Sequence, residues 1–110
     1  MSPRPWETRF QDILTCAYNI RAFTENMSLD SFLVDPKSIR AVAFEFVTMD
    51  EATRAIPDDI RQQYPQIPWD KMQGLRNILV HEYFRIDEEI LWQSSIEDIP
   101  QLIRELEKLQ

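Results

Sequence analysis

The chain has 110 residues, 44% hydrophobic and 28% charged, which is typical of one globular domain spanning residues 1–110. Its 12 basic and 19 acidic residues give a net charge of −7. This balance argues against loose, nonspecific binding to nucleic acid, because such binding depends on phosphate neutralisation by Lys and Arg. A single glycine argues against an all-β fold, whose turns usually need several.

The expected location is the cytoplasm. No apolar run approaches the roughly 18 residues of a membrane span, and the first ten residues are too polar for a secretory signal. Cys16 is the only cysteine, so it has no internal disulfide partner, which fits a reducing compartment. We expect it to be a small buried hydrophobe rather than a reactive thiol.

The first half of the chain predicts two long helices. Apolar residues recur at helical intervals from about residue 5 to 27. Ser28 is a candidate N-cap for a short helical turn that follows. Asp35 is a candidate N-cap for the second long helix, which we expect to run from about Pro36 to Ile56.

The next segment predicts a short helical turn over residues 58–64, followed by a proline-rich connector. A third long helix is expected to begin at Trp69, to include Leu79 on its apolar face, and to end soon after Tyr83.

Two further helices are expected at the end of the chain. Asp87 is a candidate cap for a short helix through Trp92. The last helix would then begin at about Ser95 or Glu97, with Pro100 in its first turn. With no strand predicted, the elements indicate an all-α fold, a compact antiparallel bundle of four to five helices.

The segment from Arg76 to Tyr83 contains the only histidine, and it carries the chemistry. His81 can exchange protons near neutral pH, Arg76 offers a permanent planar charge suited to phosphate oxygens, and Asn77 can orient either group or a water. A cation beside a proton carrier suits cleavage of a phosphodiester by a neighbouring hydroxyl.

Helical geometry complicates this arrangement. At about 100° per residue, Asn77 and His81 would share a face, whereas Arg76 and His81 would differ by roughly 140°. A second subunit could bring its own copy opposite, which hints at a composite site. His81 and Tyr83 would differ by roughly 200°, so we expect the helix to loosen near Tyr83 or the subunit interface to bring both into one cleft.

A structural interpretation of these residues stays open. A lone histidine near a helix end often interacts with the helix C-terminus, and Arg76 could be a solvated charge paired with Glu82. Metal catalysis is not expected, because position 85 is arginine where an H-E-x-x-H zinc helix needs its second histidine. Phosphate-binding glycine loops are excluded by the glycine content, and we expect no cofactor.

The pattern Arg76-x-x-x-x-His81-x-Tyr83 resembles the signature of the HepT-like toxins of the HEPN superfamily. The surrounding sequence PQIPWDKMQGLRNILVHEYFRID is similar to that family's approach to its site, and IEDIPQLIRELEKL resembles its closing helix. The resemblance covers most of the chain, from about Phe10 onward.

This resemblance implies a HEPN-like homodimer, with higher oligomers left open, in which two Arg–His motifs meet in one cleft. It implies a toxin of a toxin–antitoxin system with metal-independent endoribonuclease activity on RNA. Arg76 and His81 would be catalytic and Asn77 would assist. An MntA-like nucleotidyltransferase antitoxin would neutralise the toxin by transferring AMP to Tyr83, which would add bulk and negative charge to the cleft.

The sequence departs from the family at one place in the second long helix. Asp50-Glu51-Ala52 stands where a Gly-Glu-Ala is common, and a helix accepts Asp better than Gly. Packing or the dimer surface is therefore expected to differ there. Glu51 remains at the family's acidic position, and both Glu51 and Glu45 are candidate supporting residues for Arg76 or His81.

A second hypothesis is a non-catalytic helical module that presents a surface to a nucleotidyltransferase or another protein. The acidic composition suits this interpretation at least as well as the first. A dimer that leaves RNA intact, but binds a protein encoded beside it, would favour it.

Overall fold

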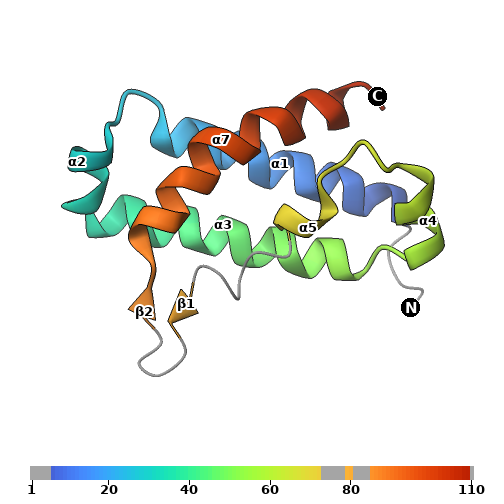
Figure 1. Cartoon of the computed structure of the whole chain (residues 1–110), viewed down its shortest axis with the longest axis horizontal. Coiled ribbons are helices and arrows are strands. Elements are labelled where there is room, and N and C mark those ends of the chain that lie inside the picture. The colour runs from blue at the N-terminus through green and yellow to red at the C-terminus, as the bar shows by residue number, and fades with distance from the viewer. Residues whose placement is uncertain (1–5, 73–78, 81–84, 110) are drawn as a thin grey trace.

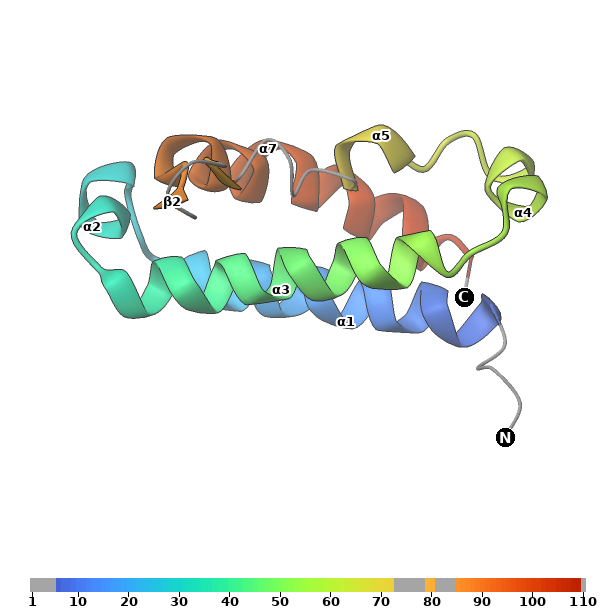
Figure 2. The same cartoon turned by 90° about the horizontal axis from the view of Figure 1, so that it is seen from below.

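The computed structural model describes residues 6–72, 79–80 and 85–109, with side chains for 6–72 and 87–109. Three long helices form the body: α1 (Trp6–Thr24), α3 (Pro36–Arg54) and α7 (Glu88–Glu107). Figures 1 and 2 show α1 and α3 antiparallel and side by side, with α7 in a second layer over them. Helix α1 contacts both α3 and α7. The predicted all-α bundle is confirmed.

Shorter helices occupy the ends of this body. Helix α2 (Leu29–Leu33) joins α1 to α3 at one end, and α4 (Asp58–Gln63) lies at the other (Figure 1). Helix α5 (Trp69–Met72) contacts α3. Within the described ranges, no helix is both long and apolar enough to cross a membrane.

The predicted N-caps form as expected in the first half of the chain. The Ser28 side chain accepts a hydrogen bond from the backbone N–H of Ser31, whose own hydroxyl accepts from the Ser28 backbone. Asp35 accepts from the Ser38 hydroxyl and backbone N–H, and these bonds lower the pKa of its carboxyl group. Helix α1 ends at Thr24, before residue 27, because Asn26 takes the left-handed conformation with φ of 67°.

The core lies between the three long helices. Each contributes one apolar face, and α2 and the connector after α4 close the ends with Phe32 and Ile67. The fully or almost fully buried apolar residues of the long helices include Ile13, Leu14, Ala17, Ile20, Val42, Phe46, Met49, Leu91, Ile99, Leu102 and Leu106.

The predicted break before the last helix is wrong, because α7 runs without interruption from Glu88 to Glu107. Ser95 does not cap a helix: it is buried, and its hydroxyl donates to the Leu91 carbonyl 2.8 Å away. Pro100 lies inside the helix and cannot donate to the Ile96 carbonyl. Ile96 is 46% exposed, so this turn lies on the solvent side of α7, and the helix continues through the proline.

The predicted third helix is wrong at Leu79. Leu79–Val80 forms strand β1, which pairs antiparallel with strand β2 (Arg85–Ile86), with Leu79 opposite Ile86 and Val80 opposite Arg85. A short apolar run cannot be assigned to helix or strand by periodicity alone, and Val and Ile favour strands. The described part of the expected helix is α5, which covers only its first turn.

Candidate functional site

The motif residues Arg76, Asn77, His81 and Tyr83 lie outside the described residues. The described residues that stand next to them in sequence form the β1–β2 ladder. Its strands flank residues 81–84 and pair Val80 with Arg85. Residues 79–80 are a strand, and the angles expected between Asn77, His81 and Tyr83 concern residues outside the described ranges.

Helix α7 anchors one side of this ladder. Asp87 follows β2 directly, and its side chain accepts a hydrogen bond from the Ile90 backbone N–H at 3.2 Å, which confirms the predicted cap. Figure 1 shows the ladder extending past α3 on the side away from α1. The capped start of α7 therefore sets where the motif segment rejoins the bundle.

Glu45, a predicted supporting residue, already has a partner within the bundle. Its carboxylate accepts a hydrogen bond from the Asn19 amide of α1 at 2.9 Å. Cys16 lies beside it, and burial raises the pKa of that thiol to about 12, with further contributions from the Glu45 and Asp12 carboxylates. The cysteine is a buried apolar residue, as predicted.

Asp50 and Glu51 are adjacent in sequence but differ in environment. Asp50 is only 5% exposed, and its Oδ2 accepts from Arg54 Nε at 2.9 Å. Its Oδ1 is buried and has no hydrogen-bond partner. Glu51, the other predicted supporting residue, is exposed. Asp50, at the position where the resemblance leads us to expect a glycine, is thus paired with Arg54 one helical turn away.

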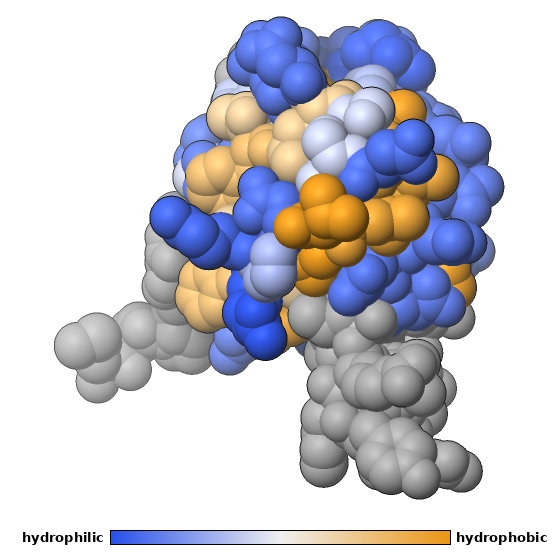
Figure 3. Space-filling view, turned by 90° about the vertical axis from the view of Figure 1, so that its left-hand side faces the viewer, coloured by the Kyte–Doolittle hydropathy of each residue, from blue (hydrophilic) through white to orange (hydrophobic). Residues whose placement is uncertain are grey.

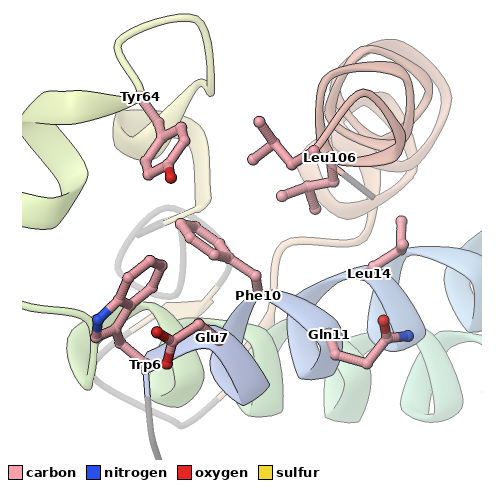
Figure 4. Close-up of a pocket in the computed structure, with 8 residues that line it drawn as sticks. Trp6, Glu7, Phe10, Gln11, Leu14, Tyr64 and Leu106 are labelled. Atoms are coloured by element: carbon pink, nitrogen blue, oxygen red, sulfur yellow. The ribbon is translucent and has the colours of Figure 1, made fainter.

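A separate pocket of about 310 Å³ lies at the end of the molecule where α4 and the C-terminus meet α1 (Figures 1 and 4). Figure 4 shows Phe10 between Trp6, Tyr64 and Leu106. The ring centroid of Phe10 lies 5.5 Å from that of Trp6 and 5.3 Å from that of Tyr64, and both contacts are edge-on. This aromatic packing closes the end of the core.

These contacts extend what the sequence patterns indicate. The Asn19–Glu45 bond joins two helices, and no pattern within one helix reports such a pair. In the described ranges, no group of three or more His, Cys, Asp or Glu side chains is arranged to hold a metal ion.

Comparison with known proteins identifies similar sequences over nearly the whole chain. Residues 13–109 match the family described as Ribonuclease HepT-like. A Methanocaldococcus jannaschii protein named "Putative RNase MJ1380" is 40% identical over 97% of this chain and 98% of its own length. A Thermococcus cleftensis protein named "Probable ribonuclease HepT" is 37% identical over 91% of each chain. No solved structure matches significantly.

Proposed function

Because this chain belongs to the HepT-like ribonuclease family, we propose that it is the toxin of a toxin–antitoxin system and cleaves RNA without a metal ion. The observation that carries the proposal is that the family match spans residues 13–109 and that Arg76, Asn77, His81 and Tyr83 all stand in this interval. The names of the relatives, which describe ribonucleases, support the reaction class.

In the proposed mechanism, His81 removes the proton from a ribose 2′-hydroxyl, which attacks the adjacent phosphorus. The bond from phosphorus to the departing 5′-oxygen breaks. His81, protonated by the first step, gives that proton to the departing oxygen. Arg76 stabilises the charge on the phosphoryl oxygens, and Asn77 orients the reacting groups. The products are a 2′,3′-cyclic phosphate and a 5′-hydroxyl, and the reaction is restricted to RNA.

The site is proposed to be composite, with Arg76 and His81 contributed across a homodimer. Glu45 and Glu51 are proposed to support it electrostatically, and no cofactor takes part. The proposed location is the cytoplasm, where RNA and the antitoxin are found.

The test is cleavage of a defined RNA by the purified protein in the presence of EDTA. Arg76→Ala and His81→Ala are each expected to lower the rate at least a hundredfold, because each removes a group that acts on the transition state. Lys108→Ala, on the exposed last turn of the chain, serves as the control and should cleave normally. Two catalytic variants as active as the parent would contradict the assignment.

Regulation is proposed to act through Tyr83, to which an MntA-like nucleotidyltransferase transfers AMP from ATP, with release of pyrophosphate. Intact-mass measurement after incubation with that enzyme and ATP should show increments of one or more AMP groups, with loss of RNA cleavage. Tyr83→Phe should show none. A Tyr83→Phe protein that gains the same mass would place the modification elsewhere.

The acidic composition favours one alternative, a non-catalytic module that binds a nucleotidyltransferase. The same cleavage assay separates the two, because the module would leave RNA intact while still forming a complex with the nucleotidyltransferase.

A further inference from the structure

One face of α3 is left uncovered by the bundle. Arg40, Phe44, Val47 and Glu51 are all exposed, Phe44 at 66% and Val47 at 38%. These four residues, here called the α3 stripe, alternate at spacings of four and three, the interval at which two helices pack along a common seam. The opposite face of the helix is buried against α1 and α7.

The α3 stripe is complementary to itself. If a second copy of α3 packs antiparallel, with the twofold axis crossing between Glu45 and Phe46, then Phe44 meets the partner's Val47. Arg40 then meets the partner's Glu51, and both pairs occur twice. A parallel arrangement sets Arg40 against Arg40, and a shift by one heptad sets Arg40 against Phe44. Of these three arrangements, only the first joins apolar to apolar and cation to anion.

We propose that a second copy of this chain docks antiparallel on the α3 stripe. The inference rests on the dimer of the proposed function and names the surface that forms it. Figure 1 shows the β1–β2 ladder extending past α3 on the side away from α1. A partner on this face would therefore lie beside the ladder that brackets His81 and Tyr83 in sequence.

The next residues along the seam are cations in both copies, since Lys37 would approach the partner's Arg54. Each has a carboxylate in its own chain. Arg54 is paired with Asp50 at 2.9 Å, and Lys37 lies close enough to Asp35 to help lower the pKa of that carboxyl group. The ends of the interface are thus partly neutralised.

A second exposed apolar area lies around α2, on the face shown in Figure 3. It includes Leu29 at 38% and Val34 at 79% exposure. These residues lie at either end of a five-residue helix and do not form a seam that repeats under a twofold axis. Val34 therefore provides a matched control, as an exposed apolar residue outside the α3 stripe.

The test is the oligomeric state of the full chain by sedimentation equilibrium over a range of concentrations. The wild type is expected to be a dimer. Phe44→Glu should weaken the dimer at least a hundredfold, because two carboxylates enter the apolar centre, whereas Val34→Glu should leave it unchanged. Circular dichroism establishes that each variant is folded.

A charge exchange makes the test specific for the register. Arg40→Glu and Glu51→Arg should each weaken the dimer about tenfold, because each sets like charges opposite one another in both symmetric pairs. The double variant restores opposite charges and should dimerise within about threefold of the wild type. A monomeric wild type, a Phe44→Glu dimer as tight as the parent, or a double variant no tighter than the single ones would overturn the inference. RNA cleavage is measured separately, so a dimer of this geometry that leaves RNA intact would sink only the proposed function.

Discussion

Cys16 illustrates how burial decides the behaviour of one side chain. The thiol is 4% exposed, and its pKa is raised from 9.0 to about 12, first by burial and then by the Glu45 and Asp12 carboxylates. Ionising it in the folded state is therefore unfavourable over the whole physiological range. A lone cysteine in an amphipathic helix predicts such burial, but the neighbouring acids that reinforce it come from other turns and from α3.

Because only the thiolate reacts, folded protein at pH 8 should be alkylated by iodoacetamide at least a hundredfold more slowly than protein unfolded in urea. Mass spectrometry of the quenched reaction measures both rates. Equal rates in the two states would contradict the burial of Cys16.

The Cys16 thiol also makes the free energy of unfolding depend on pH in the alkaline range. Its pKa in the folded state lies above that in the unfolded state, so the stabilisation is complete below about pH 9 and is lost as pH rises toward 12. Cys16→Ala should remove this part of the pH dependence. Urea unfolding at pH 8 and pH 10.5 should show a smaller loss of stability in the variant than in the wild type, and equal losses would argue against the coupling.

Arg54 donates a hydrogen bond to one of the two carboxylate oxygens of the buried Asp50. Arg54→Ala would leave Asp50 buried without its cation, which is expected to destabilise the protein by about 1–3 kcal/mol. Urea unfolding measures the change, with the exposed Arg104→Ala on α7 as a control expected to differ by less than about 0.5 kcal/mol. An Arg54→Ala variant as stable as the parent would show that the pair does not offset the burial of Asp50.

Helix boundaries follow the sequence wherever a side-chain cap or a proline defines them. Ser28, Asp35 and Asp87 cap three helices as expected, because a short polar side chain before an apolar pattern can satisfy free N–H groups. The pattern misleads at Ser95 and Pro100, where a potential cap and a potential first-turn proline lie within one helix. Whether Pro100 interrupts α7 depends on the surroundings of that turn of the helix, which are a tertiary property.

The Asp87 cap lies directly after β2 and can be tested alone. Asp87→Ala should destabilise the protein by about 1 kcal/mol, because the first N–H groups of α7 lose an acceptor. Glu97→Ala, exposed in the middle of α7, should change stability by less than about 0.5 kcal/mol. Urea unfolding compares the two, and equal effects would show that Asp87 is not an effective cap.

At the level of the assembled protein, the fold class was accessible from periodicity, whereas the surroundings of the candidate site were not. The apolar spacing from Met72 to Leu79 fits a helix, but pairing with Arg85–Ile86 draws Leu79–Val80 into a strand. Such pairing depends on residues that a local pattern does not include. Arg76, His81 and Tyr83 are candidates because of their chemistry and the family resemblance, and all three stand within the interval that matches the family.

If two Arg76–His81 motifs meet in one cleft across a homodimer, as proposed, Arg76 of one subunit can act with His81 of the other. The most direct measurement is RNA cleavage by an equimolar mixture of Arg76→Ala and His81→Ala proteins, exchanged under conditions that permit subunit mixing. Half of the dimers would then be mixed, and each mixed dimer would contain one complete site of two. About a quarter of the wild-type activity is therefore expected. A mixture no more active than either variant alone would contradict it.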